Sequence, residues 1–218
     1  MTEQPKDLTE HSVQSSAAEQ LKYRTQHSQQ ILSDSTMVQY LLSESLTDRG
    51  YFQALEVWVQ CWRTLELLEQ LHRPQAPSLR NIPKERCISA QADLVALNGQ
   101  FGYTPLAPGQ ELPYGAAFPF WSQNSVDWYG LVFAMCVLSQ EFKPIGQHLS
   151  AHFSQSVSAE HLSFFNSDKP NTNLSGAELK SWNRWLSSCL TTDAAIEASI
   201  TTATELLYWF NRCLKTAE

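Results

Sequence analysis

Apolar residues recur at steps of three and four positions along most of the chain, which is the spacing of one face of an α-helix. In residues 51–72, YFQALEVWVQCWRTLELLEQLH, the apolar stripe consists of Tyr51, Leu55, Trp58, Trp62 and Leu65. This stripe predicts a long helix that faces the core and ends before Pro74. A second stripe predicts the last helix of the chain and consists of Ile196, Ile200, Ala203, Leu207, Phe210 and Leu214.

Three further segments lie between these two stripes. Residues 87–99 carry Ile88, Ala92, Leu94 and Leu97 and predict a shorter helix that stops at Gly99. Glycine and proline then interrupt residues 98–119, which predicts a long loop of a kind that is often functional. Residues 126–153 are apolar on nearly all sides as far as Leu138, so we expect the most buried helix here, with a kink or break at Pro144.

No segment shows the alternation of a strand, so the predicted fold class is all-α, with seven or eight helices. We place these helices in a single domain over residues 19–218. Residues 1–18 are polar and rich in Ser, Gln and Glu, and they predict a disordered N-terminal arm.

Composition narrows the choice of compartment and partner. The 218 residues are 43% hydrophobic and carry a formal charge of −7 without a cluster of basic residues, which argues against nucleic acid as a main partner. The sequence shows neither a secretory signal nor a long apolar run, so we expect a cytoplasmic protein without a membrane partner. Its five cysteines are widely spaced, which predicts reduced and mostly buried thiols.

Several short motifs occur in a characteristic order. They are LKYRTQHSQQIL (21–32), ADLVALNG (92–99), the pair Phe164 and Phe165, the pair Trp182 and Trp185, and YWFNRCL (208–214). In this order they make residues 20–215 resemble the bacterial heme oxygenase family, particularly the biliverdin-producing enzymes associated with bacterial phytochromes. The resemblance implies a heme oxygenase-like fold, a heme cofactor and a separate reductase as electron donor.

The first motif departs from the family where the resemblance places the iron ligand. The family pattern is of the type Leu-Lys/Arg-x-x-Thr-x-x-x-His-x-x-Leu, and Gln29 stands at the position of the histidine. An amide oxygen is a weak donor to heme iron, whereas a neutral imidazole is a good one. His27 is the alternative metal ligand, but two residues correspond to a rotation of about 200° on a helix. We therefore expect His27 and Gln29 to face opposite sides.

A second departure falls in the helix that the resemblance places over the other face of the heme. The family pattern resembles Tyr-x-x-Glu-Gly-Ser-x-Leu-Gly-Gly-x-x-Ile, and Gly130, Phe133 and Ile145 anchor the matching stretch FAMCVLSQEFKPI. Cys136 stands in place of the glutamate. Val137, Leu138, Glu141 and Phe142 stand in place of the Gly-Ser and Gly-Gly pairs, so side chains project where the family has none.

The candidate cofactor-binding residues are therefore Lys22, Arg24, His27, Gln29, Phe133, Cys136 and Val137. The resemblance places Lys22 where the family offers a cation to a heme propionate, and Arg24 lies half a turn further on. For both we favour an ordinary exposed cation. For Gln29 we favour a surface or helix-pairing amide, and for Cys136 we favour a structural thiol over a nucleophile or thiolate ligand.

One further pair of residues has metal-binding spacing. His148 and His152 lie four positions apart, so their rings share one helix face and can bind a metal if Glu56, Glu66 or Glu69 supplies a further ligand. We favour a core or boundary role for the histidines. We likewise expect Trp58, Trp62 and Trp128 to be core residues rather than a stacking platform.

Two main hypotheses of function follow. The first is a degenerate and noncatalytic heme oxygenase-like protein that binds a tetrapyrrole, another small molecule or a protein partner. The second is an active heme oxygenase that opens heme to biliverdin, with His27 as a displaced ligand. A metal-dependent oxidase on the same scaffold is a weaker third hypothesis. We prefer the first because the iron ligand and the distal glycines are lost together.

Overall fold

The computed structural model describes residues 15–72, 82–103, 125–157, 159–166 and 176–215, and this part of the chain is all-α, as predicted. The elements in chain order are α1 (Ala17–Arg24), α2 (Gln26–Ser33), α3 (Thr36–Leu41), α4 (Asp48–His72), α5 (Ile82–Phe101), α6 (Ser125–His152), the 3₁₀ helix η1 (Ala159–Leu162), α7 (Ser163–Asn166), α8 (Gly176–Cys189) and α9 (Asp193–Lys215). None of the helices in these ranges is both long and apolar enough to span a lipid bilayer.

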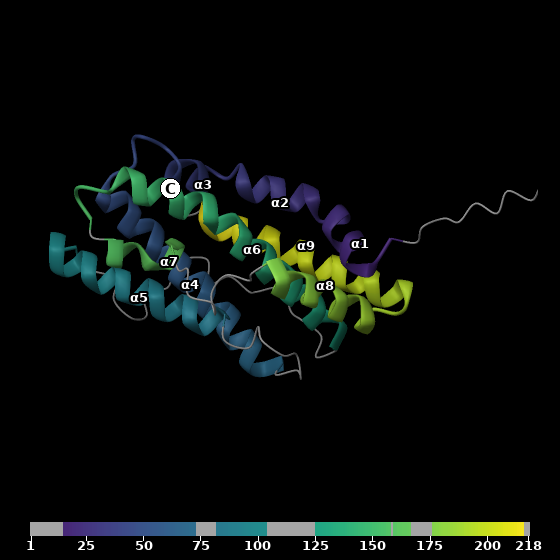
Figure 1. Cartoon of the computed structure of the whole chain (residues 1–218). Helices are drawn as coiled ribbons and strands as arrows, with labels where there is room; N and C mark the ends of the chain where they lie inside the picture. Colours follow the sequence, from purple (N-terminus) through teal and green to yellow (C-terminus); the bar gives the residue numbers. More distant parts are fainter. Residues whose placement is uncertain (1–14, 73–81, 104–124, 158, 167–175, 216–218) are drawn as a thin grey trace, which may run out of the picture.

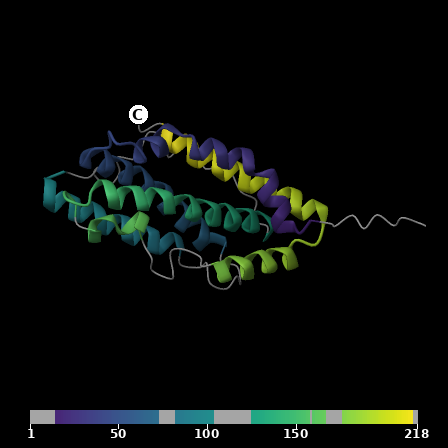
Figure 2. The same cartoon turned by 45° about the horizontal axis from the view of Figure 1, so that its top comes forward.

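The helices form an elongated bundle, with α1 to α3 along one edge and α5 along the opposite edge (Figures 1 and 2). The most extensive packing joins α6 to α9 and α4 to α5. Helices α1 and α2 pack against α9, while α7 packs against α5 and α6. Helix α9 therefore lies between the first helices and the centre of the bundle.

Helix α4 confirms the helix predicted for residues 51–72, and its buried face carries an aromatic cluster. Trp58 and Trp62 of α4 are buried, as is Trp128 of α6, in agreement with the predicted core role. The Trp58 ring makes edge contacts with Phe165 and Phe210, at centroid distances of 5.6 and 4.9 Å. Such pairs add about 0.5–1.5 kcal/mol beyond the burial of their area. This cluster joins α4, α7 and α9.

The N-terminal pattern forms two helices instead of one. A capping box at Ser16 and Glu19 starts α1 at Ala17, so ordered structure begins before the predicted boundary at residue 19. Ala17 and Ala18 are buried, and residues 1–14 of the predicted arm lie outside the described residues. At Thr25 the side chain donates a hydrogen bond to the Leu21 carbonyl, a pattern that bends helices, and α2 begins directly afterwards.

Helix α5 also departs from its prediction. The predicted stop at Gly99 is wrong, because the helix continues to Phe101 and Gly102 follows it with a positive φ of 70°. The predicted loop therefore begins later than residue 98, and its residues 104–119 lie outside the described part. Leu94 and Leu97 are buried, whereas Ile88 and Ala92 are exposed.

Glycine is required where α6 meets α9. A Cβ atom added to Gly130 would lie 2.3 Å from the Ser199 carbonyl oxygen and 2.8 Å from the Thr202 Cβ. The first of these atoms belongs to the backbone and cannot move alone. Gly130 therefore sets the separation of α6 and α9, and α6 then runs through Pro144 to His152 without a break.

We expect Gly130→Ala to lower the free energy of unfolding by about 1–3 kcal/mol, because the added methyl group forces the two helices apart. Urea denaturation followed by circular dichroism measures this change. Gln147→Ala is a suitable control, since Gln147 is exposed on the same helix and its substitution should change stability by less than about 0.5 kcal/mol. Equal stability of Gly130→Ala and wild type would contradict the close contact.

Candidate functional site

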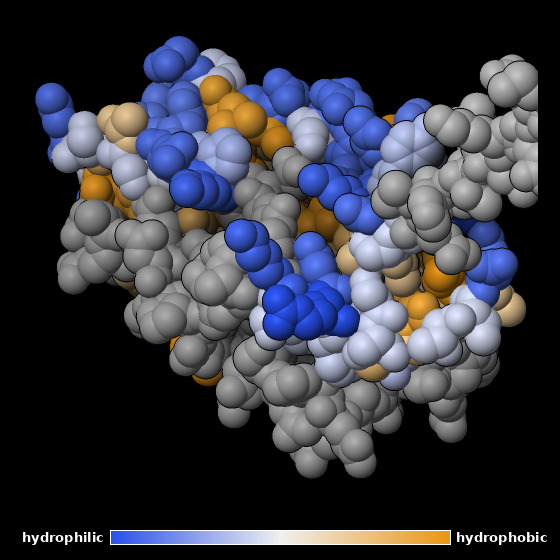
Figure 3. Space-filling model, turned by 45° about the vertical axis from the view of Figure 1, so that its right-hand side comes forward, coloured by the Kyte–Doolittle hydropathy of each residue, from blue (hydrophilic) through white to orange (hydrophobic). Residues whose placement is uncertain are grey.

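A cleft of about 400 Å³ lies at the junction of α1 and α2, where the sequence placed the first half of the candidate site. Its lining side chains are mostly polar: Glu19, Lys22, Tyr23, Gln26, Gln29, Gln30 and Ser33. The face of the molecule that Figure 3 shows is mostly hydrophilic where it is described, with smaller apolar areas. Two of the predicted residues, Lys22 and Gln29, therefore meet in one cleft.

The Gln29 carboxamide has a defined orientation in this cleft. Its Nε2 donates a hydrogen bond of 2.8 Å to the Thr25 hydroxyl, which itself donates a bond of 2.7 Å to the Leu21 carbonyl. Thr25 is fully buried and Gln29 is half-buried. The amide is thus held along the helix as part of the α1–α2 junction.

His27 and Arg24 do not line the cleft. His27 is exposed. The cleft is lined by Gln26, which precedes His27, and by Gln29, which follows it, but not by His27 itself. Arg24 donates a hydrogen bond and forms an ion pair with Glu197 of α9, and both side chains are substantially exposed. Because both side chains are exposed, water screens the attraction between them and the pair adds little to stability. Arg24 therefore links α1 to α9.

Among the described residues, two charged side chains line the cleft, and only one of them, Glu19, forms hydrogen bonds within the chain. Glu19 accepts hydrogen bonds from the Ser16 backbone N–H, at 2.7 Å, and from the Ser16 hydroxyl, at 3.0 Å. These bonds lower the pKa of the Glu19 carboxyl. Glu19 is therefore occupied in starting α1, while the exposed Lys22 contributes a cation to the cleft.

The second half of the candidate site lies elsewhere in the molecule. Phe133, Cys136 and Val137 are buried in α6, the helix that packs chiefly against α9 and α7, whereas the cleft is built from α1 and α2. Burial raises the pKa of the Cys136 thiol to about 12, so it stays protonated at neutral pH and is a poor nucleophile and metal ligand. None of these three α6 residues lines the α1–α2 cleft.

These residues do not fit a heme. A porphyrin site needs mostly apolar walls and an axial donor to iron, whereas the cleft is polar and none of the described side chains lining it is an imidazole. Its central amide is bound to Thr25. On α6, the side chains from Leu131 to Leu138 are buried. The side chains of Glu141 and Phe142 lie outside the described part.

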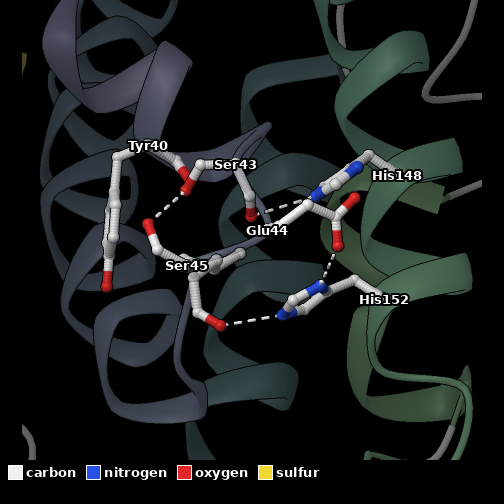
Figure 4. A network of polar contacts seen from close by, with 7 residues as sticks. Tyr40, Ser43, Glu44, Ser45, His148 and His152 are labelled. Atoms are coloured by element: carbon white, nitrogen blue, oxygen red, sulfur yellow. Dashed lines mark hydrogen bonds and ion pairs between the residues drawn. The ribbon is translucent and has the colours of Figure 1, made fainter.

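His148 and His152 fasten the connection between α3 and α4 (Figure 4). The Nε2 atom of His148 lies 3.3 Å from the Ser43 carbonyl, and that of His152 lies 2.8 Å from the Leu46 carbonyl. A carbonyl only accepts hydrogen bonds, so each Nε2 carries the proton. The His152 Nδ1 faces the exposed Glu44 carboxylate at 3.7 Å. Both histidines are half-buried, as we favoured.

The structure groups the other potential metal ligands differently from the sequence hypothesis. In the described ranges, no three His, Cys, Asp or Glu side chains are arranged to hold a metal ion. Glu66 hydrogen-bonds with Cys87 of α5, and burial raises the pKa of that thiol to about 12. The side chain of Glu69 lies outside the described residues. None of the five cysteines forms a disulfide, and four of them are buried.

A buried polar network on α5 was missed by the sequence reasoning. The Asp93 carboxylate accepts hydrogen bonds from the Ser163 N–H at 3.2 Å, the Ser163 hydroxyl at 2.6 Å and the Phe164 N–H at 2.8 Å. The Tyr51 hydroxyl lies 3.5 Å from its Oδ2. Asp93 thus binds the N-terminal N–H groups of α7 and joins α4, α5 and α7. Its position inside the motif ADLVALNG was the available signal.

Arg86 completes this network from two turns earlier on α5. Its side chain is fully buried, donates a hydrogen bond to the Phe164 carbonyl and lies 5.7 Å from the centre of the Phe164 ring. Burial lowers the pKa of Arg86 to about 9, which leaves the guanidinium charged at neutral pH. Asp93 therefore holds α7 by accepting from the N–H groups of Ser163 and Phe164, and Arg86 holds it by donating to the Phe164 carbonyl.

Comparison with protein-family models and with curated protein sequences finds no match for the chain. The resemblance to heme oxygenases therefore stays a hypothesis carried by the motifs and the helix order.

We expect Asp93→Asn to reduce the free energy of unfolding by about 1–3 kcal/mol, because an amide cannot accept bonds from all three donors. Burial raises the pKa of Asp93 above its ordinary value of 3.8, so the folded state binds its proton more tightly than the unfolded state. Stability from Asp93 is therefore lost as pH rises past 3.8 toward the raised pKa.

Urea denaturation of wild type and Asp93→Asn across the range from about pH 4 to about pH 7 tests both statements. The stability difference between the two proteins should be largest at the acidic end and should narrow as the pH rises. A difference that widens with pH would show that the carboxylate is stabilised by its donors more than it is destabilised by burial.

Proposed function

We propose that this chain is a noncatalytic heme oxygenase-like protein that acts through binding and does not degrade heme. The observation that carries the proposal is the placement of Gln29 and His27. The amide lines the α1–α2 cleft and is bound to Thr25, while the imidazole is exposed to solvent. A heme bound at this position would lack a histidine ligand.

The buried residues of α6 support the same proposal independently. Phe133 and Val137 are packed into the core, and the Cys136 thiol stays protonated at neutral pH. In the heme degradation that the resemblance implies, dioxygen bound to the iron would need space beside the backbone of α6. Recovery of the chemistry would therefore require changes on α6 as well as a new ligand on α2.

The lining of the α1–α2 cleft favours a small polar ligand over a tetrapyrrole. Gln29 and Gln30 already donate to Thr25 and Asp34 through their amide nitrogens, Gln26 adds a further amide, and Lys22 offers a cation for a carboxylate or phosphate group. Tyr23, which is 78% exposed, supplies the aromatic surface at its edge. A tetrapyrrole could place one acidic group near Lys22, but its flat ring would lie against amides.

Adding hemin to the purified protein tests the proposal. Wild type and His27→Ala should show the same spectrum, without the Soret band of histidine-ligated heme, because His27 does not face the cleft. Gln29→His supplies the imidazole at the cleft, and a band gained only in this variant would mark the cleft as a former heme site.

The contrasting result is equally specific. A histidine-ligated band in wild type that disappears in His27→Ala, with Gln29→Ala as the matched control that keeps it, would overturn the proposal. The active heme oxygenase with His27 as ligand would then be the better assignment.

A further inference from the structure

The outer face of α5 carries an apolar stripe that faces solvent. Ile88 is 55% exposed and Val95 is 71% exposed, and Ala92 and Gly99 are exposed with them. These four residues follow one another at steps of four, three and four, which is the spacing of the seam in a coiled coil. The opposite side of α5, with Leu94 and Leu97, faces the core. The stripe therefore has the pattern of a second helix-packing surface.

Neither the space around Gly99 nor its backbone conformation explains why glycine stands at this position. A Cβ atom at this position would meet nothing within 4 Å, and its φ is not positive. Glycine within a helix costs about 0.5–1 kcal/mol relative to alanine. Alanine would therefore be accepted and preferred unless another molecule packs closely against this point.

The stripe is also free of charge on a chain with a formal charge of −7. Between Cys87 and Tyr103 the sequence contains one charged residue, Asp93, and its side chain is buried and bound to α7. A partner that recognised charge would find none here. A second copy of this chain, in contrast, can bring up the same face without like-charge repulsion.

We propose that two copies of this chain form a dimer in which their α5 helices pair antiparallel along this stripe. A two-fold axis midway between Ala92 and Val95 places Ile88 opposite Gly99 of the second copy, and Ala92 opposite Val95 of the second copy. Each contact then joins a large side chain to a small one, so the helices keep an even separation over the approximately 16 Å from Ile88 to Gly99.

A parallel pairing in register is less suitable. It would place Ile88 against Ile88 and Gly99 against Gly99, which crowds one end of the helix pair and leaves a gap at the other. The order of large and small residues along α5 thus favours a second copy of the chain as the partner, with its α5 helix antiparallel.

Light scattering coupled to size-exclusion chromatography tests the dimer on the full chain. Wild type should have a molar mass about twice the 24.7 kDa of one chain, and Val95→Glu should have a mass close to one chain. Gln53→Glu introduces the same carboxylate on the exposed face of α4 and should remain dimeric. Circular dichroism should show the same helix content in all three proteins.

A monomeric wild type would overturn the proposal, and it would leave coverage of the stripe by another segment of this chain as the explanation. A Val95→Glu variant that remains dimeric would also overturn it, since the dimer would then use another surface. Loss of the dimer in Gln53→Glu would likewise count against the assigned face.

Cross-linking tests the direction of the helices and does not depend on the folding of Val95→Glu. Ile88→Cys and Gly99→Cys, each in a Cys189→Ser background, are mixed and treated with oxidised glutathione, which takes up the two electrons and two protons released as the disulfide forms. The mixture should yield covalent dimer faster than either variant alone. Equally fast cross-linking of Ile88→Cys alone would indicate parallel helices and overturn the antiparallel pairing.

Discussion

The close approach of α6 and α9 at Gly130 determines how the remaining helices can be arranged. The Ser199 carbonyl occupies the place that a side chain at residue 130 would take, so the two helices pack closely at this point. Helices α1 and α2 then rest on the outer side of α9. Gln29 consequently faces a cleft formed within the first two helices, and the side chains of Phe133, Cys136 and Val137 belong to the core.

This arrangement explains why the candidate residues have different roles from those that the motifs implied. Thr25 binds the Gln29 amide and bends the first helix, while Arg24 joins α1 to α9 through Glu197. His148 and His152 hold a backbone connection through two carbonyls. The polar groups of these residues therefore hold helices and a connecting loop together.

Much of the fold could be predicted from the sequence because helical periodicity is local. The apolar stripes of residues 51–72 and 196–214 predicted α4 and α9, and the rotation between residues 27 and 29 predicted their different exposures. The polar network could not be predicted, since Asp93 and Arg86 depend on the placement of α7, far away in the chain. The end of α5 was misjudged because two glycines follow closely, and only Gly102 adopts a positive φ. Ile88 and Ala92 are apolar, yet they face solvent, and periodicity alone does not distinguish a core stripe from an interface.

The proposal of a noncatalytic protein rests on two features: Gln29 stands where a histidine ligand would be expected, and the side chains of Phe133, Cys136 and Val137 on α6 are buried. Titration with iron-free protoporphyrin, followed by the amide NMR signals of residues 133–137, separates space from iron ligation. These signals should stay unchanged at every porphyrin concentration, because residues 133–137 belong to the buried core. Saturable shifts confined to α6 and the neighbouring part of α9 would show that a porphyrin-sized space exists there, and would contradict the account.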